Sequence, residues 1–369
     1  MTSNEGMPPY LDRAFWEGRR VFITGHTGFQ GSWLSLWLAD LGAEVVGFSL
    51  SDDNPANLFP HDRNPPHVET VWGDVRDPAA IAEALNAAAP SIVVHLAAQA
   101  LLPRSYRDPV ETFATNVMGT VHLLEAIRKA GTVQAAVLVT SDKCYRNPGS
   151  PVPFSEEAVL GGYDPYGSSK ACAEIAIGAY RASFMNAEDR ACRIASVRPG
   201  NVIGGGDWSE NRLVPDLVRA AQNDLPVSIR NPDGVRPWQH VLEPLHGYLL
   251  LAERLCGANG ARFAEEWNLG PADEDCRPVS YIVERFATAW GRAVATSAEN
   301  RGAIPEAATL RIDSTKAIAR LGWRRRLNLD AAIDWTAEWH RRHLNGETPQ
   351  QIALDQIRRY QNEVSDERD

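Results

Sequence analysis

Cysteine is scarce in this sequence, and no segment has the pattern of a leader or a membrane span. Five of the 369 residues are cysteine, an odd number, and no two of them are separated by two residues. Disulfide frameworks and zinc knuckles need paired, regularly spaced cysteines, so the count predicts a reducing compartment and a cytoplasmic protein. Residues 1–10 are polar, and the uncharged stretches 21–39 and 84–103 are interrupted by glycines or by proline and histidine, which argues against membrane spans.

Basic residues are also in deficit, with 37 Lys and Arg against 47 Asp and Glu, a formal net charge of −10. Nucleic acids and anionic membranes are bound by basic surfaces, so neither is an expected partner. A small anionic ligand is compatible with this charge, because it needs only a local cluster of arginines. No metal site is expected, since His26, His240 and His246 are not spaced as a set of ligands.

Short apolar segments alternate with helical patterns over the first 200 residues. The expected strands are 20–24, 44–48, 70–72, 91–96, 135–140 and 195–198. The expected helices are 32–41, 77–88, 110–130 and one that starts at Tyr166. Strands that are apolar throughout and alternate with helices predict a Rossmann-type α/β fold, a doubly wound parallel sheet with helices on both faces.

The pattern becomes irregular after residue 200, which predicts a smaller mixed α/β domain. Its expected helices are 214–223, 243–256 and 279–289, and a last helix is expected from Pro349, with Thr348 as its cap. The length suits roughly two domains. We expect a tail at 1–14, a Rossmann domain at 15–200 that takes back parts of 235–265, and a substrate domain with the C-terminal helix within 201–369.

A glycine-rich turn, Gly25-His26-Thr27-Gly28-Phe29-Gln30-Gly31, lies between the first expected strand and its helix. Glycines at this spacing let a backbone approach a pyrophosphate at a helix N-terminus, so the turn predicts a dinucleotide cofactor. The alternative is a tight strand–helix turn with no ligand. No Lys or Arg occurs between Arg20 and Arg63 to balance the 2′-phosphate of NADP, and NAD is therefore favoured.

The sequence pattern leaves open which residues contact the adenosine half of the cofactor. The second expected strand ends in Phe48-Ser49-Leu50-Ser51, and the ribose partner is open between Ser49, Ser51 and Asp52. Asp74 and Val75, after the third strand, are candidates for an adenine contact. Asp74 could instead cap its own turn.

Tyr166 and Lys170 are four residues apart, and Asp164 and Pro165 before them are typical of a helix start. The pair is therefore expected on one helical face. A phenol with a pKa of ~10 is a poor base at neutral pH, and a nearby ammonium lowers that pKa. The fifth expected strand ends in Thr140-Ser141-Asp142-Lys143-Cys144-Tyr145, where ligands of open α/β sheets bind, so a serine hydroxyl can reach the reacting alcohol there.

The glycine turn, the serine and the Tyr-x-x-x-Lys pair occur in the order typical of the extended short-chain dehydrogenase/reductase family, which the sequence resembles over nearly its whole length. The longer strings 25–34, 141–145, 198–208 and 236–245 are similar to those of the CDP-glucose 4,6-dehydratases in that family, with Gln30 where a lysine is expected. The resemblance implies oxidation of CDP-glucose at C4 by NAD, loss of water across C5 and C6, and return of the hydride to C6. The product, CDP-4-dehydro-6-deoxyglucose, would supply deoxysugars of surface polysaccharide such as lipopolysaccharide.

The resemblance also implies roles for the reacting residues. Tyr166 is the base for the 4-hydroxyl, Lys170 lowers its pKa and holds the nicotinamide ribose, and Ser141 hydrogen-bonds the 4-oxygen. Asp142 protonates the departing 6-hydroxyl. Lys143 stands where related dehydratases have a glutamate base, so it acts as a neutral base at C5, stabilises the enolate oxygen, or orients a water. A solvated Asp142–Lys143 ion pair is the alternative without function.

Binding residues follow from the same resemblance. Cofactor contacts are expected from Gly25, Thr27, Gly28, Phe29, Gln30, Gly31, Ser49, Asp74, Val75, Leu96, Ala97, Ala98, Gln99, Thr140, Tyr166, Lys170 and Pro199. Substrate contacts are expected from Asn201 and from the cations that a diphosphate requires, Arg212, Arg236 and His240, with Arg230 as a further candidate. For Trp208 and Trp238, core packing and a base or sugar contact are both open, and His95 is expected in the core.

Three rival functions remain open at this point. A nucleotide-sugar 4-epimerase needs Tyr166 and Lys170 but has no use for Asp142, and a 4,6-dehydratase for another nucleotide sugar fits the same motifs. A non-catalytic NAD-binding protein would not need the intact set. A homodimer or homotetramer is expected, because the apolar faces of 110–130 and of the Tyr166 helix match the helices by which the family dimerises; packing within one subunit is the alternative.

Overall fold

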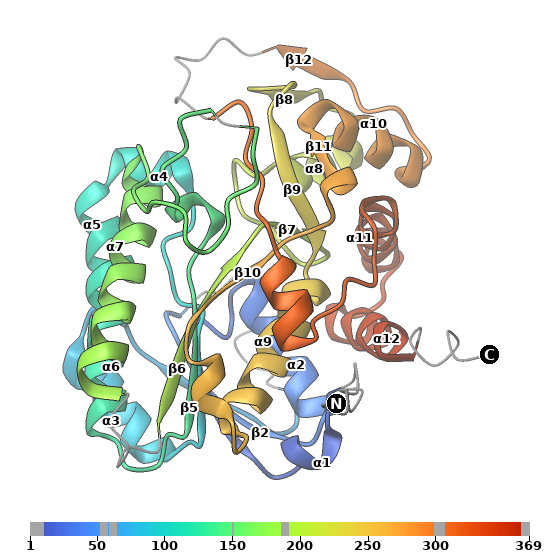
Figure 1. Cartoon of the computed structure of the whole chain (residues 1–369). Helices are drawn as coiled ribbons and strands as arrows, with labels where there is room; N and C mark the ends of the chain where they lie inside the picture. Colours follow the sequence, from blue (N-terminus) through green and yellow to red (C-terminus); the bar gives the residue numbers. More distant parts are fainter. Residues whose placement is uncertain are drawn as a thin grey trace, which may run out of the picture.

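The computed structural model describes residues 11–51, 58, 65–149, 151–185, 192–298 and 307–362. Seven parallel strands form the central sheet in the order β10-β6-β5-β4-β1-β2-β3, which confirms the predicted Rossmann class (Figure 1). The strands are β1 (Arg20–Thr24), β2 (Glu44–Ser49), β3 (Val68–Trp72), β4 (Ile92–His95), β5 (Ala135–Val139), β6 (Arg193–Pro199) and β10 (Glu266–Leu269).

Helices cover both faces of this sheet, and side chains alternate between two cores. On β1, Val21 and Ile23 join one cluster of buried residues, whereas Phe22 joins the other. One face carries α3 (Pro78–Ala88), α6 (Gly119–Lys129) and α7 (Pro165–Tyr180), and the other carries α2 (Phe29–Asp40) and α9 (Leu242–Cys256) (Figure 1). Both faces are therefore apolar, which explains why the strands read as continuous hydrophobic runs.

The helix expected at 110–130 is interrupted. The chain forms α4 (Leu102–Arg107) and α5 (Pro109–Phe113), then a π-helical turn at Ala114–Met118, and then α6. Within the turn, the Asn116 side chain bonds to the loop after β4 and to α7, so tertiary contacts replace regular helix geometry at this point. The caps expected at Asp77 and Thr348 are confirmed by bonds to the first turns of α3 and of α12 (Pro349–Asn362).

The second domain contains two small sheets. The first has β7 (Asn201–Ile203), β9 (Val235–His240) and β11 (Cys276–Pro278), and the second pairs β8 (Val227–Ile229) with β12 (Thr296–Ala298). Helices α8 (Leu213–Asn223) and α10 (Val279–Trp290) pack against them around a third core. The remaining elements are α1 (Arg13–Trp16), the 3₁₀ turns Asp142–Cys144, Gly260–Phe263 and Asp273–Asp275, and the π turns Arg181–Met185 and Ala317–Leu321.

The C-terminal part of the chain contributes to the main sheet and to its core. The seventh strand of the main sheet is β10, just beyond the stretch 235–265 expected to return to the first domain. The helix α11 (Leu329–Leu344), which was not among the expected helices, and α12 (Pro349–Asn362) place Trp339 and Tyr360 in the same core as Trp33 and Trp37 of α2. Within the described ranges, no helix is long and apolar enough to cross a membrane.

Candidate active site

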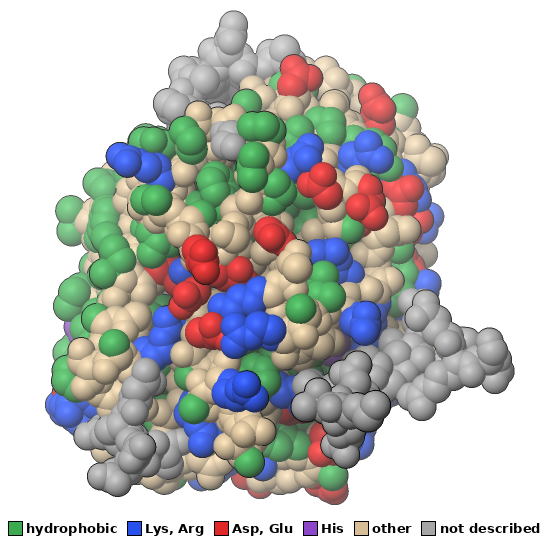
Figure 2. Space-filling view, in the orientation of Figure 1, with side chains coloured by type: hydrophobic (Ala, Val, Ile, Leu, Met, Phe, Trp, Pro, Cys, Tyr) green, Lys and Arg blue, Asp and Glu red, His purple; other side chains and the backbone are tan. Residues whose placement is uncertain are grey.

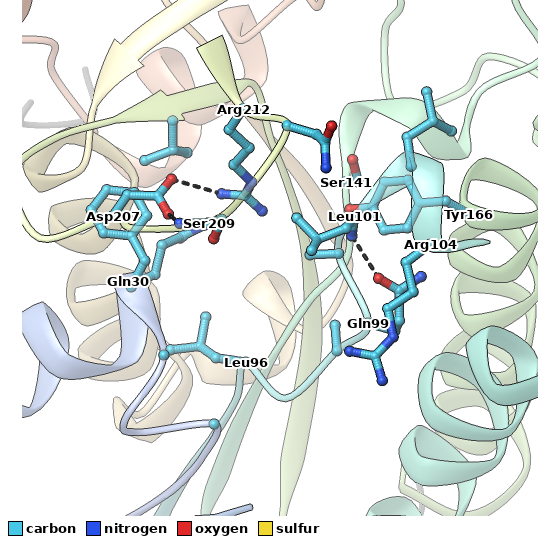
Figure 3. A pocket seen from close by; sticks show the side chains of 18 of the residues that line it. Gln30, Leu96, Gln99, Leu101, Arg104, Ser141, Tyr166, Asp207, Ser209 and Arg212 are labelled. Carbon is cyan, nitrogen blue, oxygen red and sulfur yellow. Dashed lines mark hydrogen bonds and ion pairs between the residues drawn. The ribbon is translucent and has the colours of Figure 1, made fainter. Parts of the chain in front are cut away.

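A cleft of about 840 Å³ lies between the carboxyl ends of the parallel strands and the loops of the second domain. Ser141 and Tyr166 lie on one side of the opening and Asp207 and Arg212 on the other (Figure 3). Nearly all predicted site residues line it: Gly25, Thr27, Gly28, Phe29, Gln30, Ser49, Asp74, Val75, Leu96, Ala97, Ala98, Gln99, Thr140, Ser141, Asp142, Lys143, Tyr166, Lys170, Pro199, Asn201, Arg212, Arg230 and Arg236. Gly31 and His240 do not.

The glycine turn forms a cradle at the bottom of the cleft. Gly25 has φ +76°, and a Cβ there would lie 2.7 Å from the backbone nitrogen of Ala97, so only glycine fits. Gly31 is needed for packing within the turn rather than for contact with a ligand, because a Cβ on it would lie 2.0 Å from the Gly25 carbonyl oxygen. Gly28 is the N-cap of α2, whose first turn has no side-chain cap. A helix N-terminus presented in this way suits a pyrophosphate.

Two of the adenosine-side candidates have internal partners. Ser49 Oγ lies 2.9 Å from His26 Nδ1 and accepts the Thr27 N–H at 3.3 Å. Burial lowers the pKa of His26 to about 4, so this imidazole is neutral. Asp74 accepts the backbone N–H and the guanidinium of Arg76, which lower the pKa of the carboxyl, and it therefore caps its own turn. Ser51 lines the cleft, and Asp52 lies outside the described residues.

The loop after β4 is fixed by buried polar contacts. His95 lies 2.6 Å from Thr24 Oγ1, and burial lowers its pKa to about 3, so it is a core residue as predicted. The Gln99 backbone N–H donates to Asn116 Oδ1 at 2.8 Å, and Asn116 Nδ2 in turn donates to Ser169 Oγ of α7 at 2.9 Å. No sequence pattern points to Asn116, because its partners are distant in the chain.

Asp142 and Lys143 share a hydrogen-bond network at the end of β5. Ser141 Oγ donates to Asp142 Oδ1 at 3.1 Å, and Lys143 Nζ lies 3.3 Å from the same oxygen. Lys143 Nζ also donates to Asn201 Oδ1 at 3.1 Å. Asp142 is almost completely buried, and its Oδ2 has no partner among the described residues. One oxygen of the carboxyl is thus buried without an internal partner in the described part of the chain, and the surroundings are not those of a solvated ion pair.

Tyr166 stands in the first turn of α7, where Asp164 caps the Gly167 N–H at 2.8 Å. Burial raises the pKa of Tyr166, and the Lys143 ammonium is the charge that most opposes this rise. Lys170, one turn further along, is buried, donates to the Val139 carbonyl at 3.3 Å, and has its pKa lowered by burial to about 8. Burial therefore raises the pKa of the Tyr166 phenol and lowers the pKa of the Lys170 amine.

A buried ion pair that the sequence did not reveal lies beneath this pair. Glu174, one turn after Lys170, accepts from Arg198 at 2.6 Å and from Thr140 Oγ1 at 2.5 Å. Ser196 Oγ also donates to it at 2.9 Å. The spacing of four from Tyr166 to Lys170 to Glu174 was the available signal. The pair joins β5 and β6 to α7 and so fixes the strand ends relative to Tyr166.

The second domain supplies the basic residues of the cleft, with one correction. Arg212, Arg230 and Arg236 line it, but His240 lies at the end of β9 in the core, edge-on to Trp33 and Trp335. Burial lowers the pKa of His240 to about 3, so it can carry no charge toward a phosphate near neutral pH. The expected substrate contact of His240 is therefore not what the structure shows.

The two tryptophans left open by the sequence have different environments. Trp208 does not line the cleft and packs edge-on against His340. Trp238 lines it, but its indole N–H donates to the Arg277 carbonyl at 3.0 Å.

Comparison with known proteins identifies the family of the chain. The model of the GDP-mannose 4,6 dehydratase family matches residues 22–336. The chain belongs to this dehydratase family. A curated CDP-glucose 4,6-dehydratase of Salmonella typhimurium is 46% identical over 340 residues, which cover 91% of this chain and 94% of the relative. A UDP-glucose 4-epimerase of Erwinia amylovora is 27% identical over 345 residues, 89% of this chain and 99% of the relative.

Solved structures agree with this membership of the dehydratase family. The dTDP-glucose 4,6-dehydratase DesIV of Streptomyces venezuelae, solved with NAD bound, has a TM-score of 0.74 at 25% identity and covers 90% of this chain and 99% of its own. The UDP-glucose 4-epimerase of Thermus thermophilus, also in complex with NAD, has the same TM-score at 25% identity, covering 87% and 99%. Dehydratases and epimerases therefore share the scaffold.

Proposed function

We propose that the chain is an NAD-dependent CDP-glucose 4,6-dehydratase, a hydro-lyase that converts CDP-D-glucose to CDP-4-dehydro-6-deoxy-D-glucose and water. The observation that carries the proposal is the position of Asp142 and Lys143 beside Ser141 and Tyr166 in one cleft. An epimerase needs the phenol but has no use for a buried carboxyl beside it. The 46% identity to a CDP-glucose 4,6-dehydratase supports both the reaction and the cytidine base.

The glycine turn and the N-terminus of α2 fit NAD, because the turn lines the cleft and the first turn of α2 has no side-chain cap to compete with a pyrophosphate. NAD, when bound there, accepts the hydride from C4 of the sugar and returns it to C6. The residues that would hold it are those of the glycine turn, the loop 96–99, and the ends of β2, β3 and β5. The Rossmann domain, completed by α9 and β10, would hold this cofactor, and the second domain would hold the substrate.

Tyr166 and its neighbours handle the first proton. Tyr166 Oη takes the proton of the 4-hydroxyl, while Ser141 Oγ hydrogen-bonds the same oxygen. Burial raises the pKa of Tyr166, so the phenolate depends on nearby cations, of which Lys143 opposes the rise most strongly. Arg212 is the second cation that opposes the rise. Lys170, one turn further along α7, would hold the nicotinamide ribose. The Asn116 and Glu174 networks keep α7 against the strand ends and so keep Tyr166 in place.

Asp142 and Lys143 carry out the elimination. Oδ1 of Asp142 accepts from Ser141 and Lys143, so the proton for the departing 6-hydroxyl is carried on Oδ2. The 4-ketone acidifies the proton at C5. Lys143 Nζ, held by two oxygen acceptors, acts in one of two ways. As a neutral amine it takes the C5 proton itself; as an ammonium it stabilises the enolate oxygen that forms, while a water that it orients takes the C5 proton.

The diphosphate is bound at the opposite end of the cleft. Arg212, Arg230 and Arg236 line this part, and Arg212 is the N-cap residue of α8, whose first turn has no side-chain cap. Guanidinium groups and a helix N-terminus both favour phosphate oxygens. Asn201 faces the sugar side through its contact with Lys143.

We further propose a homodimer formed through α5, α6 and α7. Val110, Phe113, Met118 and Ile175 are exposed apolar side chains on this side of the molecule. Figure 2 shows hydrophobic side chains along the left edge, where Figure 1 places α5 and α7. The free thiols of all five cysteines support the proposed cytoplasmic location. A product of this kind would supply deoxysugars for surface polysaccharide.

The test is incubation of the purified full-length protein and NAD with the CDP-, dTDP- and GDP-activated sugars. We expect a 4-keto-6-deoxy product, followed by its alkaline absorbance, from CDP-glucose alone. Turnover of only a dTDP- or GDP-sugar would reassign the base, and formation of a 4-epimer would reassign the reaction.

A further inference from the structure

The run Gly204-Gly205-Gly206-Asp207 places a buried carboxylate on the arginine side of the cleft, and the dehydration chemistry leaves that carboxylate without a role. Asp207 is 5% exposed, and its Oδ2 accepts from Arg212 Nη1 at 3.2 Å (Figure 3). Its other oxygen caps the Ser209 N–H at 3.0 Å. A negative charge in a proposed diphosphate site repels the ligand. Its presence there therefore calls for a compensating role in binding.

The position of Asp207 is fixed by packing from the cofactor domain. A Cβ on Gly205 would lie 2.0 Å from Trp339 Cγ, and the Gly205 carbonyl accepts the indole N–H of Trp33 at 2.9 Å. Trp33 belongs to α2, the helix that starts at the glycine turn. The loop that carries Asp207 is therefore held against a rigid element, whereas Arg212 is 34% exposed and has a long side chain.

We propose that Asp207 is a positioning residue that holds the Arg212 guanidinium in place in the cleft, so that the site for the substrate diphosphate exists before the ligand arrives. This inference rests on the proposed function in assigning the diphosphate to Arg212. An arginine that becomes ordered only when its ligand binds gives weaker binding than an arginine that is already held in place. The loss of conformational entropy of the side chain then reduces the free energy of binding. The gain from holding Arg212 exceeds the repulsion, since the pair with Arg212 largely neutralises the Asp207 charge.

The test compares CDP, which has the diphosphate, with cytidine, which has none, by calorimetric titration of the full-length protein. Asp207→Asn should weaken CDP binding roughly tenfold, the size expected for one newly ordered side chain, and should leave cytidine within twofold. The KM for CDP-glucose should rise while kcat stays within a factor of about two, because the bonds of Asp207 go to Arg212 and Ser209, not to Ser141 or Tyr166. Asp207→Ser, which retains an oxygen for the Ser209 N–H, is the second variant if the amide impairs folding.

Two further variants separate positioning from charge. Asp216→Asn removes a carboxylate from the same cleft wall, but that carboxylate pairs with Arg219. It should bind CDP at least as tightly as the unaltered protein. In an Arg212→Ala background, Asp207→Asn should have no further effect, because the two residues act as one unit.

Equal or tighter CDP binding by Asp207→Asn overturns the inference, as does an equal loss for cytidine or an additive loss in the Arg212→Ala background. An unaltered protein that binds CDP no better than cytidine also overturns it. Failure of the proposed function is seen separately, as absence of CDP-glucose turnover by the unaltered protein. If another nucleotide sugar is turned over, the same comparison is made with its nucleoside diphosphate and nucleoside.

Discussion

Lys143 Nζ lies 3.3 Å from Asp142 Oδ1, while Oδ2 of the same carboxyl has no partner among the described residues. One oxygen is thus used for internal support, and the other, buried without such a partner, is the one that the proposed mechanism assigns to the leaving hydroxyl. This relationship separates a dehydratase from an epimerase on a scaffold that both share, and it makes Asp142 the most informative residue to change.

Asp142→Asn should slow formation of the 4-keto-6-deoxy product by about 10²–10⁴-fold, because the amide keeps the size of the side chain but cannot protonate a leaving hydroxyl. Oxidation at C4 should continue, so reduced nicotinamide should accumulate and be visible by its absorbance. Asp273→Asn, which alters an exposed carboxylate paired with Arg311 outside the cleft, is the control. Retention of most turnover by Asp142→Asn would argue for an epimerase.

The pH dependence of kcat/KM should report the ionisation of Lys170. Its pKa is lowered from 10.5 to about 8 by burial, so the free protein loses this positive charge as the pH rises through 8. We expect kcat/KM to fall above pH 8. In Lys170→Arg the guanidinium stays charged, and whatever activity remains should no longer fall in that range. A fall at the same pH in both proteins would assign it to another group.

The glycine cradle can be tested by cofactor binding. In Gly25→Ala the added Cβ meets the Ala97 backbone, and the φ of +76° is unfavourable for alanine, so the stabilisation of the protein by added NAD should be lost. Gly178→Ala in α7 is a matched control, because its Cβ meets nothing within 4 Å. It should retain the NAD response and gain up to about 1 kcal/mol in stability. Thermal unfolding with and without NAD measures both.

Glu243 predicts a pH dependence of stability. This carboxyl accepts the N–H groups of Arg326 and Leu327, and burial raises its pKa from 4.5 to about 7. The folded protein therefore keeps a proton that the unfolded chain loses, and the contribution is full below pH 4.5 and lost as the pH rises through 7. The free energy of unfolding of the unaltered protein should therefore fall between pH 5 and pH 8. In Glu243→Gln that fall should be smaller by up to about 3 kcal/mol.

Glu253 has a pKa raised by burial to about 7 as well, so the single variant removes only part of the slope. Glu284→Gln, which changes an exposed carboxyl, should follow the unaltered protein. Denaturant titrations at the two pH values measure the difference. Parallel slopes for Glu243→Gln and the unaltered protein would show that Glu243 is already ionised when folded.

The proposed dimer face can be tested with charges. Val110 is 78% and Ile175 62% exposed, so Val110→Asp with Ile175→Asp should leave the fold intact but convert a dimer to a monomer in light scattering. Leu344→Asp, at the end of α11 and 52% exposed, is the control and should stay dimeric. An unchanged mass for the double variant would place the interface elsewhere.

Local patterns were enough to predict the parallel sheet, the glycine turn and the start of α7. Asp164, Pro165 and the Tyr166–Lys170 spacing all lie within one stretch of chain, and each has a direct physical reason. Asp77 and Thr348 were recognisable as caps for the same reason.

What the sequence did not reveal depends on partners far along the chain. Asn116 bonds to Ser169, Glu174 pairs with Arg198, and β10 joins β6 although many residues separate them. His240 was expected at the substrate as one of the cations that a diphosphate requires, but the end of β9 lies in the core beside Trp33. Helical periodicity also could not show the π turn at Ala114–Met118, which tertiary hydrogen bonds impose.

The central claim is an internal redox dehydration, and the most direct measurement follows the hydrogen at C4. CDP-glucose deuterated at C4 is incubated with the protein and NAD, and the product is examined by NMR. We predict a 4-keto-6-deoxy sugar with the deuterium at C6. Deuterium retained at C4 of an epimerised sugar, or its absence from C6, would contradict the account.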